Sequence, residues 1–277
     1  MTDTVPWQLR MFNKSLKKKM RYGVLKKHLG DIGENERCIL ITCGDNNGAM
    51  NYYLRELGGQ WSFADLEDTC IAEMSELLGQ QVLLAEDDKL DYPDAHFDRV
   101  VTIDVHEHLD DPGPFSMEVG RVTRPGGQVI CTVPNGDESK VVVKIKHAVG
   151  MTTAEYGHTR VGLTISELKE IMQQSKVEPS RTSTFSRFFT ELLELTINFL
   201  YVKVLAKRGK AKVEKGQIAP ATQDQLKSVE KTFKIYSMIY PIYWLVSRLD
   251  ALVFFTEGYV VVVEGRRSAA RWQLPGR

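Results

Sequence analysis

A glycine turn follows the first strongly apolar run of the chain. Ile39-Leu-Ile-Thr42 leads into Gly44 and Gly48, with polar residues between the two glycines. Glycine lets a backbone approach a ligand closely and adopts positive φ readily, so such a turn can direct N–H groups at a polar ligand. Asn tolerates the left-handed conformation next best, and Asn46 and Asn47 are therefore expected to replace glycines. The alternative is an ordinary connection between a strand and a helix.

Acidic residues end the apolar runs that come next. Asp65 lies about 20 residues after the turn, where a carboxylate suits hydrogen bonds to ribose hydroxyls. Glu67 is the nearby alternative for that role, and an N-cap for the next helix is the alternative for Asp65 itself. Glu86-Asp-Asp88 and Asp104 end two further runs. Ligands of parallel sheets bind at the carboxyl ends of the strands, so these ends predict one site.

Strands and helices must alternate to place those ends together. Apolar runs predict strands at 38–43, 61–64, 81–85, 97–103 and 128–133, and helical patterns lie at 48–57, 68–78 and 114–122. A helix over 164–173 begins with a capping box, and strands are expected at 178–187 and 258–264. This rhythm predicts an α/β fold with a mostly parallel sheet and helices on both faces.

The segment from Glu86 to Asn135 carries an ordered series of motifs. After the acidic stretch come Leu90-Asp-Tyr92, Phe97-Asp98, Asp104, Glu107-His-Leu109 and Pro125-Gly-Gly127. In order and spacing this resembles class I S-adenosylmethionine-dependent methyltransferases, in particular the type 11 group related to ubiquinone biosynthesis. The similarity covers roughly residues 36–135. It implies a Rossmann-like sheet, methyl transfer and S-adenosylmethionine as cofactor.

The resemblance also implies cofactor-binding roles for particular positions. The methionine part would lie among the turn residues, the ribose at Asp65 and Leu66, and the adenine amino group near Asp87 or its neighbours Glu86 and Asp88. Asp104 and Val105 would lie beside the methionyl end and the substrate entrance. The turn residues in question are Thr42, Gly44, Asn47 and Gly48. Leu40 and Thr42 depart from the family, which usually has an acid and a glycine there. An inactive, methyltransferase-like binding scaffold is therefore an alternative.

Methyl transfer needs an aligned acceptor and, for a hydroxyl or ammonium acceptor, a base. The candidate catalytic residues are His108, His158 and Tyr156, with Tyr156 as an orienting hydroxyl. His106 is a further candidate base, and Arg160 could meet a substrate in the loop that follows Tyr156. Structural hydrogen bonding is the alternative for His108, and a solvated loop is the alternative for residues 155–164.

Charge and hydropathy divide the chain into four parts. Residues 1–30 form a basic amphipathic helix over Trp7–Leu29, and 31–187 form the methyltransferase core. Residues 188–256 are an apolar helical insertion with a basic linker at 207–215, and 257–277 hold the last strand and a tail. The net charges of 1–30, 31–200 and 201–277 are +7, −15 and +8. Two basic ends around an acidic middle favour an anionic partner.

The insertion decides what kind of acceptor we expect. Its second apolar run contains Tyr236, Tyr240, Tyr243 and Trp244, a composition typical of membrane interfaces. We expect a lipid or amphiphilic acceptor, an anionic membrane surface as partner, and a cytoplasmic protein bound peripherally to the inner face of the membrane. A helical cap, a homodimer interface and a soluble small-metabolite enzyme are alternatives.

Other classes of site are not expected from the sequence. The four cysteines form no CxxC pair, so reduced buried thiols and no metal site are predicted. No nucleic-acid recognition motif is present, and the acidic middle would repel a polyanion. No run reaches the roughly 18 apolar residues of a membrane-spanning helix, and residues 1–30 lack a signal-peptide pattern.

Overall fold

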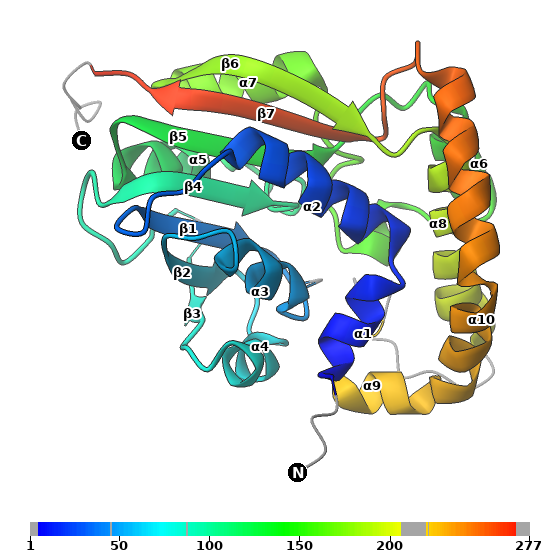
Figure 1. The fold of residues 1–277 in the computed structure, drawn as a ribbon. Coiled ribbons are helices and arrows are strands. Elements are labelled where there is room, and N and C mark those ends of the chain that lie inside the picture. Colours follow the sequence, from blue (N-terminus) through cyan, green and yellow to red (C-terminus); the bar gives the residue numbers. More distant parts are fainter. Residues whose placement is uncertain (1–4, 45, 87, 206–219, 221, 270–277) are drawn as a thin grey trace.

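The computed structural model describes residues 5–44, 46–86, 88–205, 220 and 222–269. Its centre is a seven-stranded sheet with the order β3-β2-β1-β4-β5-β7-β6 (Figure 1). Strands β1 to β5 pair in parallel, and β7 is antiparallel to both of its neighbours. This confirms the predicted Rossmann-like sheet. The strands are β1 Arg37–Thr42, β2 Gln60–Asp65, β3 Leu83–Leu84, β4 Phe97–Ile103, β5 Thr123–Pro134, β6 Val177–Phe185 and β7 Val260–Arg267.

Helices cover both faces of this sheet (Figure 1). On one face, α2 Leu16–Leu29, α3 Ala49–Arg55 and α4 Ile71–Leu78 share a buried apolar cluster with β1 and β2. On the other, α5 Pro112–Val122 and α7 Ile165–Gln174 form a second cluster. Strands covered on both faces read as unbroken apolar runs, which is why the valines of β7 are so easily recognised.

The N-terminal segment forms two helices, where a single one was predicted. Helix α1 spans Trp7–Asn13 and ends before Ser15, whose side chain accepts a hydrogen bond from the Lys18 N–H and so caps α2. The basic residues of this amphipathic segment do not all face solvent. Arg21 is only 9% exposed because it points under the helix into the molecule.

The predicted insertion stands at the carboxyl ends of the parallel strands (Figure 1). Its helices pack with α6 and η1 around a third apolar cluster. Among the described residues, no helix combines the length and apolar character needed to cross a membrane. The elements at this end are α6 Val141–Ala148, η1 Thr153–Tyr156, α8 Phe188–Phe199, the π-helix η2 Leu200–Leu205, α9 Gln223–Ser228, α10 Glu230–Ser247 and η3 Arg248–Val253.

Candidate active site

A cavity of about 420 Å³ lies where the strand ends meet the insertion. Its inner wall includes Thr42 at the end of β1, Asn47 in the turn that follows, Asp104 after β4, and Arg21 of α2. Its outer wall comes from α8, η2 and α10. The fold thus brings the predicted cofactor turn and the predicted insertion to one space.

Asp65, at the end of β2, stabilises the turn after β1 through hydrogen bonds. Its side chain is 0% exposed and accepts hydrogen bonds from the N–H of Gly44 (2.8 Å) and of Glu67 (2.9 Å), and from the Thr42 hydroxyl. Burial raises the pKa of Asp65, and these bonds oppose the rise. Helix α4 has Cys70 at its N-cap, so the alternative of Asp65 as a helix cap is wrong.

The two departures from the family pattern are accommodated in this turn. Thr42 donates to Asp65 and accepts a hydrogen bond from Asn46 Nδ2 at 3.1 Å, so its hydroxyl joins the network. Leu40 is 0% exposed and belongs to the apolar cluster beneath α2 and α3. Neither residue distorts the strand end that carries the turn.

The asparagines of the turn act through their side chains, and the expectation that they replace glycines is wrong. Gly44 and Gly48 have φ of 68° and 83°, whereas Asn46 and Asn47 have no positive φ. Asn46 Oδ1 accepts the Gly48 N–H at 3.1 Å, and Asn47 Oδ1 accepts the Ala49 N–H at 3.2 Å. Side chains of this type stabilise turns by bonding the backbone two residues on.

Asp104 presents a carboxylate at the end of β4. It has a φ of 49°, and its Oδ2 forms an ion pair of 2.5 Å with Arg21 Nη2. Asp104 Oδ1 is buried and has no hydrogen-bond partner among the described residues. The side chain as a whole is 30% exposed and lines the cavity, so the carboxylate can meet a ligand there.

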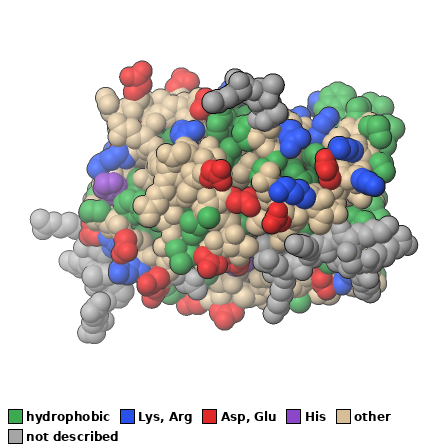
Figure 2. Space-filling view, turned by 90° about the horizontal axis from the view of Figure 1, so that it is seen from below, with side chains coloured by type: hydrophobic (Ala, Val, Ile, Leu, Met, Phe, Trp, Pro, Cys, Tyr) green, Lys and Arg blue, Asp and Glu red, His purple; other side chains and the backbone are tan. Residues whose placement is uncertain are grey.

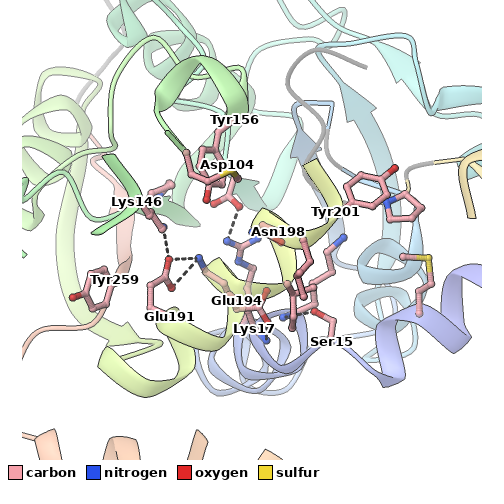
Figure 3. A pocket seen from close by; sticks show the side chains of 18 of the residues that line it. Ser15, Lys17, Asp104, Lys146, Tyr156, Glu191, Glu194, Asn198, Tyr201 and Tyr259 are labelled. Atoms are coloured by element: carbon pink, nitrogen blue, oxygen red, sulfur yellow. Dashed lines mark hydrogen bonds and ion pairs between the residues drawn. The ribbon is translucent and has the colours of Figure 1, made fainter. Parts of the chain in front are cut away.

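A cluster of charges lies on the insertion side of the cavity. Figure 3 shows Glu191 of α8 between Lys17 and Lys146, with Nζ to carboxylate distances of 3.1 and 2.6 Å. Ser186 donates a further hydrogen bond of 2.7 Å to Glu191. Burial alone would raise the pKa of Glu191, but the two lysines and Ser186 hold it well below its usual range. Glu194, one turn on, has its pKa raised by burial.

Two of the histidine candidates lie together and the third does not. The rings of His108 and His158 are 4.7 Å apart, and both residues line the cavity with Tyr156. Burial lowers the pKa of His158 to about 3 and raises that of Tyr156 to about 12, so both are neutral over the usual pH range. His106 instead points into the core, 3.1 Å from Ser116 Oγ and against Phe115, so it is wrong as a candidate base.

Comparison with known proteins agrees with this arrangement. Residues 41–131 match the methyltransferase domain family. This region of the chain is therefore a methyltransferase domain. The cofactor it uses is S-adenosylmethionine.

Solved structures share the fold of this methyltransferase over most of its length. The YcgJ protein of Bacillus subtilis has 11% identity and a TM-score of 0.54, covering 91% of this chain and 100% of its own. Phosphoethanolamine N-methyltransferase 2 of Haemonchus contortus, in complex with S-adenosyl-L-methionine, has 15% identity and a TM-score of 0.55, covering 90% and 52%. A chain of the complex with the Haloferax volcanii Trm112 methyltransferase activator has 13% identity and a TM-score of 0.55, covering 96% of both chains. No curated protein matches the sequence.

The residues present fit the cofactor of this family. The Asp104 carboxylate lines the cavity and can accept a hydrogen bond from an ammonium group such as that of the methionine part. Gly44 has no side chain in the way, and a Cβ there would come within 2.4 Å of Glu67 Oε2. Because Asp65 is occupied inside the turn, Glu67 is the more exposed of the two acids at this strand end. The roles of Asp65 and Glu67 toward the ribose stay predictions.

The remaining predicted cofactor residues lie at different depths. Val105 is 0% exposed and packs in the core beneath the cavity, and Leu66 is partly buried at the end of β2. Asp88 is exposed beyond β3, and Asp87 lies outside the described residues. Their predicted contacts with the cofactor stay predictions.

The sequence analysis did not predict most of the charged cluster on the insertion side of the cavity. The basic amphipathic pattern of Trp7–Leu29 does not distinguish Arg21 and Lys17 from its other cations, and no motif marks Glu191, Glu194 or Lys146. The available signal was that Glu191 and Glu194 interrupt an otherwise apolar run three residues apart, which places both on one face of a helix.

Proposed function

We propose that this enzyme transfers a methyl group from S-adenosylmethionine to a lipid or other amphiphilic acceptor at a membrane surface. The observation that carries the proposal is a cavity with two chemically different parts. The inner part holds Asp104, His108 and Tyr156, and the outer part is mainly apolar and aromatic beyond the charged residues Glu191 and Glu194. Such a space suits a molecule with a polar group at one end and a hydrocarbon chain at the other.

The outer part is built by the insertion. Its walls are one side of α8 with η2 and one side of α10, and these carry Ile197, Tyr201, Phe233, Tyr236 and Ile239. Tyr236 donates a hydrogen bond to the Lys14 carbonyl, which joins α10 to the end of α1. Apolar walls of this kind favour burial of hydrocarbon by about 25 cal/mol per Å².

The outer face of α10 supports entry from a membrane. Along α10 and the following η3, six apolar residues recur at steps of three and four and have exposed fractions between 40% and 72%. Hydrophobic side chains gather beside lysines and arginines at the α10 end of the molecule (Figure 2). The six, which we call the α10 stripe, are Ile235, Met238, Ile242, Leu245, Leu249 and Leu252.

The stripe is continuous with the cavity. Leu200 and Ile235 line the cavity and are also 43% and 57% exposed, so the apolar part reaches the surface beside the stripe. Exposed apolar patches bordered by polar residues mark interaction sites with membranes or proteins. Arg248 lies 4.4 Å from the Trp244 ring at the end of α10, where a cation would meet lipid headgroups at the inner face of a membrane.

The inner residues have separate tasks. S-adenosylmethionine, when bound, supplies a methyl group already activated on a sulfonium. Arg21 holds the Asp104 carboxylate in place at the strand end. Tyr156 keeps its proton and can donate a hydrogen bond to the acceptor, and the neutral His108 and His158 can accept one.

Vesicle co-sedimentation tests the membrane part of the proposal. The double variant Ile242→Glu/Leu245→Glu should reduce binding to anionic vesicles by at least tenfold, because each buried leucine-sized side chain contributes about 1.5–3 kcal/mol. Leu84→Glu is the matched control, since Leu84 is 62% exposed on β3, away from the insertion. Equal binding by all three proteins would contradict the proposal.

Two further measurements separate the alternatives. If the double variant instead converts a dimer to a monomer, a second copy of the chain covers the stripe. Mass spectrometry should show an added methyl group on a lipid extract incubated with the enzyme and cofactor. Methylation confined to water-soluble extracts would favour the soluble small-metabolite enzyme. Deleting residues 1–29 is a poor test, because Lys17 and Arg21 line the cavity.

A further inference from the structure

Glu107 is a buried carboxylate without an assigned role. It directly follows His106 in the turn after β4 and is 0% exposed. Both of its carboxylate oxygens are buried and neither has a hydrogen-bond partner among the described residues. Burial disfavours the ionised form of such a group, so it is either protonated or paired with a cation such as a metal ion. A metal ion would supply the partner that the described residues do not.

Two imidazoles face the same point. One ring nitrogen of His108, one of His158 and a carboxylate oxygen of Glu107 all lie within 4.8 Å of one another. Ligands about 2.1 Å from a tetrahedral ion are about 3.4 Å apart, a difference that side-chain rotation can close. Both histidines line the cavity, so an ion bound there would have coordination positions open toward the acceptor.

The fold holds these three residues together through the backbone. The Thr159 N–H donates to the Glu107 carbonyl at 2.9 Å, and the Thr159 hydroxyl donates to the same oxygen at 3.1 Å. Arg160 Nη2 bonds the carbonyls of Leu109 and Asp110 at 3.1 and 2.7 Å. The loop that carries His158 is thereby fastened along the turn that carries Glu107 and His108.

A second partner orients one of the imidazoles. The His108 ring makes a hydrogen bond with the backbone of Gly157. Metal-bound histidines usually direct their second nitrogen to a carbonyl or carboxylate in this way, which fixes the ring and its tautomer. A second group of possible ligands is less suitable, namely Cys43, Glu67 and His108. Glu67 is exposed to solvent, and the Cys43 thiol already donates a hydrogen bond of 4.0 Å to Glu67 Oε1.

We propose that Glu107, His108 and His158 bind a divalent transition-metal ion at the acceptor side of the cavity. Two imidazoles and one carboxylate suit Zn²⁺, Mn²⁺, Fe²⁺ or Co²⁺. The open positions would hold an oxygen atom of the acceptor and so orient it toward the cofactor. The role of the ion in orienting the acceptor rests on the proposed methyl transfer, whereas binding of the ion to the three residues does not. No short sequence motif predicts this site, because His158 comes from a loop 50 residues beyond His108.

Metal uptake by the full, tag-free chain tests the proposal. After treatment with a chelator, the protein is dialysed separately against Zn²⁺, Mn²⁺ and Co²⁺, and bound metal is measured by mass spectrometry. We expect one ion per chain for at least one metal, and a visible absorption band for the Co²⁺ form. Failure of the wild-type protein to take up any of the three would overturn the proposal.

Variants show whether the ion is at this site. Glu107→Gln and His158→Ala should each weaken affinity about 100-fold or more, since loss of a supporting partner alone costs about 10–100-fold. His96→Ala should bind like the wild type, because His96 lies at the amino end of β4, opposite to His108. Unchanged affinity in both ligand variants would overturn the assignment.

Thermal melting tests the site without measuring activity, and it also shows whether each variant is folded. Without metal, Glu107→Gln should melt no lower than the wild type, because it removes an unpaired buried carboxylate. With saturating metal, only the wild type and His96→Ala should rise in melting temperature. An equal rise in Glu107→Gln would contradict the site.

Discussion

The two sides of the cavity are built in different ways. The turn after β1 is a local structure, in which Asp65, Thr42 and Asn46 satisfy the polar groups of a few neighbouring residues. The opposite wall joins residues far apart in sequence, such as Lys17 and Glu191, which are separated by 174 positions. The first can be recognised from motifs, whereas the second exists only when helices α2, α6 and α8 have come together.

The difference also concerns charge. On the turn side, the buried carboxylate of Asp65 has its oxygens satisfied by hydrogen bonds from the backbone and from a hydroxyl. On the insertion side, Glu191 is neutralised by two lysines, and its neighbour Glu194 is not equally compensated. The insertion wall should therefore respond more strongly to substitutions of charge, and the turn to substitutions of shape and hydrogen bonding.

The largest effect is expected for Glu191→Gln. It leaves Lys17 and Lys146 without their shared carboxylate, and breaking a buried pair of this kind costs about 3 kcal/mol of unfolding free energy. Glu194→Gln on the same helix is the matched variant and should cost under about 1 kcal/mol, since burial already favours its neutral form. Urea denaturation measures both. Equal losses would show that the two acids are equivalent.

The pH dependence of stability sharpens the same comparison. The folded pKa of Glu191 is depressed, so its contribution is present above the unfolded value of about 4.3 and is lost as the pH falls below it. The difference in stability between wild type and Glu191→Gln should be full at pH 7 and shrink steadily below about pH 4. A difference that stays constant down to acid pH would mean that the ion pairs do not stabilise the fold.

On the turn side, Asp65→Ala should weaken binding of S-adenosylhomocysteine by about 2 kcal/mol. The Gly44 and Glu67 N–H groups lose their acceptor, and a lost charged hydrogen bond is worth about 1.5–3 kcal/mol. Isothermal titration measures the change, with the exposed Asp91→Ala as control. Unaltered affinity would show that the turn keeps its shape without Asp65.

Asn47→Ala should have the smallest effect. It removes the Asn47 side-chain oxygen that accepts the Ala49 N–H, whereas the hydrogen bond from the Gly48 N–H to Asn46 still stabilises the turn. We expect about 1 kcal/mol loss of S-adenosylhomocysteine affinity by the same titration, the usual value for a capping side chain. A loss as large as that of Asp65→Ala would mean that Asn47 contacts the cofactor directly.

The sequence by itself determined the sheet, the glycine turn and the family. Strand runs such as Val260–Val263 are continuous and apolar because both faces are covered, and the acids at Asp65 and Asp104 follow from the need for polar residues at strand ends. These are short-range patterns, and each can be recognised within a few residues. Even so, the prediction that Asn46 and Asn47 replace glycines was wrong. Asparagine is common both in left-handed backbone and in turns held by its side chain, so the residue type alone does not distinguish the two.

Only the tertiary structure decided which charges face the cavity. An amphipathic pattern does not say whether Arg21 lies in water or beneath its helix, since that depends on Asp104 at the end of a distant strand. The same holds for Glu107, His108 and His158, which the bonds of Thr159 and Arg160 bring together. Side-chain partners across long sequence separations are set by packing of whole elements, and no local pattern records them.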